Sequence, residues 1–218
     1  MNLVTNSAIF SIIVQAIAGF FLYRALFIKL AQSDQILKTI VKLELSVQLL
    51  EGFFYLFIIW RLIKGSYGAD FRYYDWFITT PTMLISTMFF LEYLNETPVS
   101  IKDTFNENKL VISGMLGFNA LMLIVGFFGE RGVIGKYPAF IIGTLFLILS
   151  FGCLYQFAKK SEKGKKFFWV MFFIWSLYGV AFLLPLGPKN ISYNILDLFS
   201  KNFYGIFLYF VIRNKLFI

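Results

Sequence analysis

Seven long apolar stretches, joined by short polar segments, constrain this 218-residue chain more than any other feature. They cover residues 8–30, 35–62, 71–94, 109–128, 134–158, 164–186 and 190–216. An α-helix needs about 20 apolar residues to cross a bilayer. Because 59% of all residues are hydrophobic, a soluble domain of this length could not bury them. The sequence therefore predicts an all-α membrane protein, a seven-transmembrane-helix bundle that forms one domain over residues 1–218 within the lipid bilayer.

The basic residues predict how this bundle is oriented. The formal net charge is +8, and the largest basic group follows the fifth stretch: Lys159, Lys160, Lys163, Lys165 and Lys166. Positively charged loops stay on the cytoplasmic side of a membrane. We expect the N-terminus outside and the C-terminus inside, and interpret the charge as a topology signal, with no nucleic acid as partner. The first stretch lacks a preceding basic segment and a cleavage site, which predicts a retained helix rather than a signal peptide.

The scarcity of reactive side chains argues against several kinds of site. The chain has no histidine and a single cysteine, Cys153. Histidine is the commonest metal ligand and general base, and an internal disulfide needs two cysteines. We expect no metal site and a protein that is not an enzyme.

Lys201 and Asp197 lie inside the last apolar stretch, where a charged side chain costs about 3 kcal/mol or more. Their four-residue spacing places them on one helix face. Such a pair can be a structural ion pair. Alternatively, the lysine amine can act as a nucleophile that binds a carbonyl compound as a Schiff base. The pair alone does not distinguish these two interpretations.

Two further motifs favour the Schiff base. Residues 72–81 read RYYDWFITTP, and the sixth stretch contains Trp175-Ser176 followed by Tyr178. Together with the lysine motif of the last stretch, they occur in the order and at the separation found in the microbial (type 1) rhodopsins. The chain resembles this family over essentially its whole length.

The resemblance implies a cofactor and the residues that hold it. All-trans retinal would be bound to Lys201 through a protonated Schiff base, with Asp75 and Asp197 as counter-ions and Arg72 stabilising both carboxylates. The other cofactor-binding residues would be Trp76, Thr79, Thr80, Met83, Asn119, Met122, Trp175, Tyr178 and Phe182.

Some details of the pocket are expected from single residues. Tyr74 is suited to enclose the polyene, and Thr79 can hydrogen-bond Asp75 from the next helical turn. Gly179 stands where the family usually has a proline, and Phe182 where it usually has a tryptophan. These departures affect helix motion and pocket shape rather than retinal binding.

Ser86 is the departure with the largest functional consequence. It follows Asp75 by eleven residues, at a position where the light-driven proton pumps of the family carry a carboxylic acid. That acid returns a proton to the Schiff base, and such donors need a pKa near the working pH. Serine does not meet this need, so the sequence argues against an efficient outward proton pump.

Two carboxylates in the second stretch point to ion conduction instead. Glu44 and Glu51 lie two turns apart on one helix face, about 10 Å along its axis, and Gln48 and Tyr55 extend the same polar line. Intramembrane carboxylates typically mark ion paths. The alternative for both Glu44 and Glu51 is structural pairing, and for Glu44 the partner would be one of three nearby basic residues: Arg24, Lys38 or Lys42.

The finer pattern resembles the group 1 viral rhodopsins. The resemblance rests on these residues: Ser11, Glu44, Glu51, Asn194, Asp197, Lys201 and Asn202. It implies a light-gated cation channel in which photoisomerisation opens a path for transported cations, lined by Ser11, Glu44, Glu51, Asn194 and Asn202. A light-driven outward proton pump with Glu44 as donor is the alternative, and a sensory rhodopsin or a receptor without retinal is less favoured. A homo-oligomer is compatible with the sequence. If the protein is of viral origin, we expect it in a host cell membrane.

Overall fold

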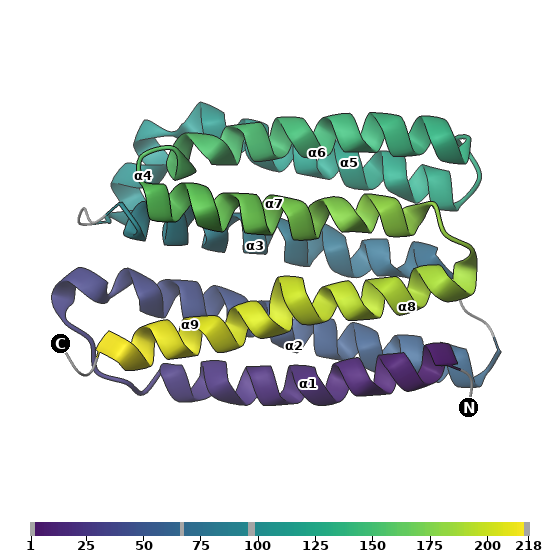
Figure 1. Cartoon of the computed structure of the whole chain (residues 1–218), viewed down its shortest axis with the longest axis horizontal. Coiled ribbons are helices and arrows are strands. Elements are labelled where there is room, and N and C mark those ends of the chain that lie inside the picture. The colour runs from purple at the N-terminus through teal and green to yellow at the C-terminus, as the bar shows by residue number, and fades with distance from the viewer. Residues whose placement is uncertain (1–2, 66–67, 96–98, 216–218) are drawn as a thin grey trace.

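The computed structural model describes residues 3–65, 68–95 and 99–215, and these form a bundle of long helices packed side by side (Figure 1). Six of its rods are single helices: α1 (Leu3–Ala25), α2 (Ile36–Ile63), α3 (Arg72–Tyr93), α5 (Lys109–Glu130), α6 (Lys136–Ala158) and α7 (Glu162–Phe182). A seventh rod consists of α8 (Leu186–Asp197), a π-helical turn η3 (Leu198–Asn202) and α9 (Phe203–Asn214). The all-α seven-helix prediction is confirmed.

The structure differs from the predicted stretches in three places. The first helix covers Leu3–Ala25 rather than 8–30. A short helix, α4 (Ile101–Glu107), lies in a segment expected to be a loop, and Ser100 caps it by accepting a hydrogen bond from the Asp103 amide. The last helix is interrupted by η3, because one wide turn replaces the regular helical pattern around Lys201.

Helix α3 is the most polar rod, and its place in the bundle explains why. Six helical segments of the described residues are long and apolar enough to cross a membrane, and α3 is not among them. It contacts α2, α5, α6 and α7, and its charged residues Arg72, Asp75 and Glu92 are buried. Its polar groups therefore face protein, whereas large apolar side chains such as Phe53, Ile141 and Phe173 are exposed on the surrounding helices.

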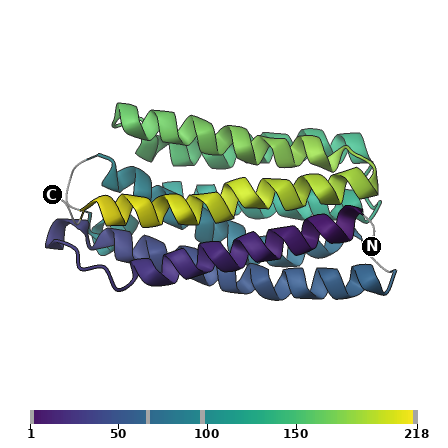
Figure 2. The same cartoon turned by 60° about the horizontal axis from the view of Figure 1, so that its bottom comes forward.

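The seventh rod is central to the site because it lies between α1 and α7. Both α8 and α9 contact α1, and α8 also contacts α7 (Figure 2). The two chain ends lie at opposite ends of the bundle (Figure 1). The turn between α6 and α7, which carries Lys159 and Lys160, lies at the end that holds the C-terminus, here called the C-terminal end.

A buried ion pair connects the start of α8 with the end of α5. The Lys189 ammonium lies 2.6 Å from a Glu130 carboxylate oxygen, and both side chains are less than a tenth exposed. Removing one partner of a buried pair leaves an uncompensated charge, which costs about 3 kcal/mol or more.

We expect Lys189→Ala to lower the melting temperature of the protein in detergent by several degrees, measured by circular dichroism. The matched control is Lys165→Ala, because Lys165 pairs with a Glu162 side chain that is 79% exposed. Exposed pairs contribute about 0–1 kcal/mol. Equal melting temperatures for the two variants would show that the buried pair does not stabilise the fold.

Candidate functional site

Lys201 lies at the centre of the bundle, in the π-helical turn, and is 2% exposed. Its ammonium nitrogen is 2.8 Å from Glu51 Oε1, 3.2 Å from Asp75 Oδ2 and 3.4 Å from Asp197 Oδ1. Helices α2, α3 and α8 thus each supply one carboxylate to the same amine. The structure brings the two predicted counter-ions together with Lys201 and adds a third carboxylate.

Glu51 was not predicted to contact Lys201, although it is the carboxylate nearest to the amine. The sequence predicted it on an ion path, with structural pairing as the alternative, and did not predict Lys201 as its partner. The available signal was its depth, because Glu51 lies near the middle of α2 and Lys201 near the middle of the seventh rod. In the folded bundle the middle of α2 lies beside the middle of the seventh rod, which brings Glu51 to Lys201. No spacing between motifs in the sequence predicts this contact.

Arg72 forms a polar network on the side of Lys201 towards the N-terminus. It lies 3.5 Å from Asp197 Oδ2 and donates hydrogen bonds to Asn190 Oδ1, at 3.1 Å, and to Asn194 Oδ1. Arg72 contacts Asp197 directly and attracts the Asp75 carboxylate through its charge without a hydrogen bond, so it acts on both carboxylates as expected.

Asn194 is the hub of this network. Its amide nitrogen donates to Ser7 Oγ at 2.8 Å, and its backbone oxygen accepts from Ser11 Oγ at 3.0 Å. Tyr55 donates to the side-chain oxygen of Asn194 at 3.2 Å. Asn194 therefore connects α8 with α1, α2 and, through Arg72, α3. Two predicted ion-path residues, Ser11 and Asn194, are in direct contact.

The three carboxylates differ in how fully they are bonded. Asp197 accepts hydrogen bonds from Tyr55 and Tyr178, both at 2.7 Å. By contrast, Asp75 Oδ1 and Glu51 Oε2 are buried without a hydrogen-bond partner. The hydroxyl of Thr79 donates to the backbone oxygen of Asp75 at 3.0 Å, so the predicted bond forms with the main chain and not with the carboxylate.

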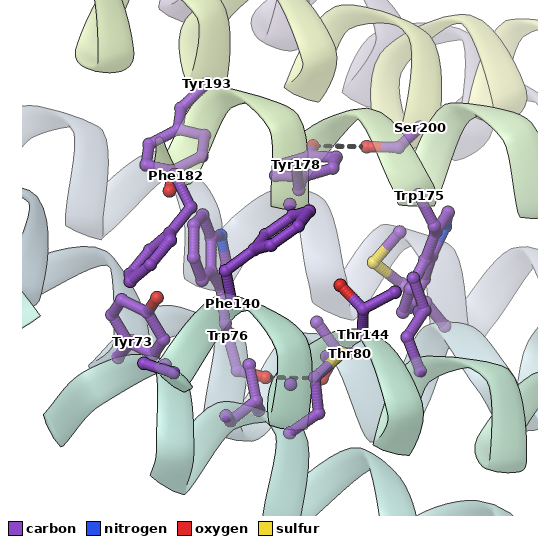
Figure 3. A pocket seen from close by; sticks show the side chains of 18 of the residues that line it. Tyr73, Trp76, Thr80, Phe140, Thr144, Trp175, Tyr178, Phe182, Tyr193 and Ser200 are labelled. Atoms are coloured by element: carbon purple, nitrogen blue, oxygen red, sulfur yellow. Dashed lines mark hydrogen bonds between the residues drawn. The ribbon is translucent and has the colours of Figure 1, made fainter. Parts of the chain in front are cut away.

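Figure 3 shows a largely apolar cavity with aromatic walls, and Lys201 is one of the residues that line it. The predicted residues that line it are Trp76, Thr80, Met83, Met122, Trp175, Tyr178 and Phe182. Tyr178 turns its hydroxyl towards Ser200, 2.8 Å away, as the dashed line shows. A buried amine that lines an aromatic-walled cavity fits a long apolar aldehyde such as retinal.

Other expected pocket residues lie outside the cavity wall. Asn119 donates a hydrogen bond to the Thr80 hydroxyl at 2.8 Å, so it supports the wall from behind. Thr79 is also absent from the lining residues. Tyr74 is 49% exposed and contacts Phe71, so the expectation that it encloses the polyene is wrong: its side of α3 faces outward.

One wall of the cavity was not predicted at all. Phe140, Gly143, Thr144 and Leu147 of α6 line it, as does Tyr193 of α8. The fifth rod in the chain order, α6, carries no recognisable motif, and its apolar residues look alike whether they face lipid or the cavity. The contact between α6 and α3 selects which of them line the cavity.

The predicted ion-path residues are all buried: Ser11, Glu44, Glu51, Asn194 and Asn202 are at most 1% exposed. Both carboxylate oxygens of Glu44 lack a hydrogen-bond partner. The same is true of Gln15 Oε1, of both side-chain polar atoms of Gln48, and of Asn202 Oδ1.

The structure contradicts the alternative in which Glu44 forms a local ion pair. The Lys38 ammonium donates instead to the backbone oxygens of Ala25 and Leu26, at 2.7 and 2.6 Å. Arg24 and Lys42 have exposed side chains, whereas Glu44 is fully buried.

Comparisons with known proteins identify the family of this chain. Residues 4–215 match the family model of bacteriorhodopsin-like proteins. Green-light absorbing proteorhodopsin from Gamma-proteobacterium EBAC31A08 is 24% identical over an alignment of 163 positions. The match covers 66% of this chain and 61% of the relative, so the chain spans less than two thirds of the relative's length. The crystal structure of viral rhodopsin OLPVRII has a TM-score of 0.83 and 26% identity, covering 95% of this chain and 96% of the other.

A third similarity concerns the fold alone. Blue light-absorbing proteorhodopsin from Med12 has a TM-score of 0.78 at 19% identity, with 98% of each chain covered. The match to the family model spans nearly the whole sequence and includes the buried lysine, the carboxylates around it and the aromatic cavity. This chain belongs to the bacteriorhodopsin-like family, the microbial rhodopsins, whose chromophore is retinal.

Proposed function

We propose that this protein is a light-gated cation channel whose path runs along α2 past Glu51 and Glu44. The observation that carries the proposal is the line of buried polar atoms without protein partners that extends from Glu51 Oε2 through Gln48 to Glu44. An unpaired buried polar group costs about 1–3 kcal/mol. Such a line is retained where water or ions bind, as in the interior of a conducting path.

The centre of this path favours cations. Three carboxylates surround Lys201, and the nearby Arg72 supplies the second positive charge, so the formal charge of the cluster is negative. Retinal bound at Lys201 supplies light absorption and a change of shape next to the amine. Transfer of the proton from the Lys201 nitrogen to Asp75, 3.2 Å away, would leave Glu51 and Asp197 without their shared positive partner, and the repulsion between these two carboxylates would favour uptake of cations.

The polar network around Asn194 closes the path on the side of the N-terminus. Arg72 is held there by Asn190 and Asn194, and Asn194 is tied to Ser7 and Ser11 of α1. A buried guanidinium repels cations. The network must therefore rearrange before cations pass, and the bond between Arg72 and Asp197 links it to the charge at Lys201.

The second candidate is a light-driven outward proton pump, and one observation favours it. The Glu44 carboxylate lies close to the hydroxyl of Ser86, the position at which related pumps carry their proton donor. A carboxylate from α2 therefore lies next to the place where α3 lacks one. In this alternative, Glu44 returns a proton to the amine.

Current measurements separate the two functions. The light-induced current of a voltage-clamped cell is recorded at stepped potentials with different cation concentrations on the two sides. We expect the current to reverse sign and its reversal potential to follow the imposed cation gradient. A current that stays outward at every accessible voltage would contradict the channel and support the pump.

We also infer that the C-terminal end of the bundle faces the cytoplasm, because it carries Lys159 and Lys160 next to the start of α7. An epitope tag at the C-terminus should then be reached by antibody only after the cell membrane is permeabilised. Labelling of intact cells would contradict this orientation.

A further inference from the structure

Tyr204 is a buried polar residue that neither the retinal cavity nor the predicted ion path includes. It follows Lys201 by three residues, at the start of α9, and is 4% exposed. Its ring packs against Phe167 and Phe90, with centroid distances of 5.8 and 6.3 Å. Aromatic neighbours on α3 and α7 thus fix the ring and leave the hydroxyl as its polar tip.

The Tyr204 hydroxyl points into a small polar cluster between three helices. It interacts with Ser86 and Thr87 of α3 and with Glu44 of α2, and Glu44 in turn interacts with Ser86. The Tyr204 hydroxyl, Ser86 Oγ and both Glu44 carboxylate oxygens are buried without a hydrogen bond of normal geometry. Polar atoms that are buried close together without well-formed hydrogen bonds are costly, so a small movement that improves their pairing is favourable.

The surroundings of this cluster are apolar on the side of the C-terminal end. Leu37, Ile40, Phe90 and Leu208 are at most 2% exposed and belong to one hydrophobic core. A proton or cation that reaches Glu44 from the centre therefore meets tightly packed apolar side chains beyond it. The polar cluster lies at the boundary between the polar line along α2 and this apolar closure.

Tyr204 also has a direct mechanical connection to the retinal lysine. Lys201 and Tyr204 are separated by less than one turn of continuous backbone, because the π-helical turn that holds Lys201 runs directly into α9. A shift of the turn that carries Lys201 therefore moves the Tyr204 hydroxyl relative to α2 and α3. Glu44, about 10 Å from Glu51 along α2, has no such connection of its own.

We propose that Tyr204 is a positioning residue that relays movement at Lys201 to Glu44, and that Tyr204, Ser86 and Glu44 together form the inner gate of the path. The gate rests on the proposed channel function. The relay itself does not, because it concerns the state of Glu44 after illumination whichever ion moves.

The decisive variant is Tyr204→Phe, which removes only the hydroxyl and keeps the ring. Light-minus-dark infrared spectra report the carboxyl band of Glu44, which is identified by its absence in Glu44→Gln. We expect Tyr204→Phe to shift this band and to change the decay time of the photocurrent roughly fivefold. This is the change in rate that corresponds to the net free energy of one hydrogen bond. The visible absorption maximum should stay unchanged, because Tyr204 does not line the cavity.

Two comparisons distinguish a relay from simple packing. Tyr209→Phe is the matched control, because Tyr209 lies on the same helix and packs against Phe21 of α1 at 4.9 Å, away from the cluster; it should change neither readout. In the Glu44→Gln background, Tyr204→Phe should have no further effect on the decay time.

Three results would overturn the relay: a wild-type spectrum without a Glu44 band, a Glu44 band that Tyr204→Phe leaves in place, or an equal change of decay time with and without Glu44. The absence of any cation-dependent current in the wild type would overturn the channel and its gate. The infrared comparison would then still show whether Tyr204 relays movement at Lys201 to Glu44.

Discussion

Lys201→Arg abolishes retinal binding and every light response, while the helical bundle remains folded. Arginine keeps a positive charge among Glu51, Asp75 and Asp197, so none of these buried carboxylates is left without a partner. A guanidinium, however, does not form an imine with an aldehyde as a lysine amine does. The measurement is visible absorbance after addition of all-trans retinal to the purified protein, with circular dichroism as the test of folding.

Lys189→Arg is the control for this variant. Lys189 is also buried and paired with a carboxylate, at 2.6 Å from Glu130, but it is absent from the cavity wall. Its replacement should leave the visible band in place. A visible band in Lys201→Arg would show that Lys201 is not the attachment residue, and loss of the band in both variants would show that the effect is not specific to Lys201.

Glu51→Gln changes both the colour and the current, whereas Glu44→Gln changes the current alone. The Glu51 carboxylate is 2.8 Å from the Lys201 nitrogen, so it stabilises a positive charge there, and low dielectric strengthens that effect. Light moves positive charge of the bound chromophore away from this nitrogen. Removal of the Glu51 charge therefore narrows the energy gap between the ground and excited states of the chromophore. The absorption maximum moves to longer wavelength.

The two variants form a matched pair, because both replace a fully buried carboxylate of α2 by its amide. Glu44 lies about 10 Å further along the helix. Glu44→Gln should therefore leave the absorption maximum unchanged. Each variant should reduce the cation current roughly tenfold, as expected for about 1.4 kcal/mol of added barrier. An unchanged colour in Glu51→Gln would contradict its place at the amine, and unchanged currents in both would exclude the proposed path.

The helices could be predicted from the sequence because length and hydropathy determine them. Even α3 was predicted, although it is too polar to resemble the other spans, because the RYYDWFITTP motif marks its start. The short helix α4 and the π-helical turn were not predicted. The first depends on a single Ser100 cap, and the second on packing around Lys201, so neither leaves a periodic pattern in the sequence.

The site could be predicted only where a motif defines it. Asp75, Asp197 and Lys201 lie together in the structure as the family pattern implies. The contact between Glu51 and Lys201 depends on how deeply α2 and the seventh rod sit relative to each other, a tertiary property. The cavity wall from α6 likewise depends on helix rotation, because Phe140 and Thr144 resemble their lipid-facing neighbours in type.

The π-helical turn has a consequence for engineering this protein. It divides the seventh rod into two half-helices with different neighbours: α8 supplies Asp197 and Tyr193 to the chromophore, and α9 supplies Tyr204 to the cluster around Glu44. Substitutions in α8 should therefore tune wavelength, and those in α9 should tune response speed. An optogenetic tool derived from this chain could have its spectrum and its kinetics adjusted separately, on either side of one helical turn.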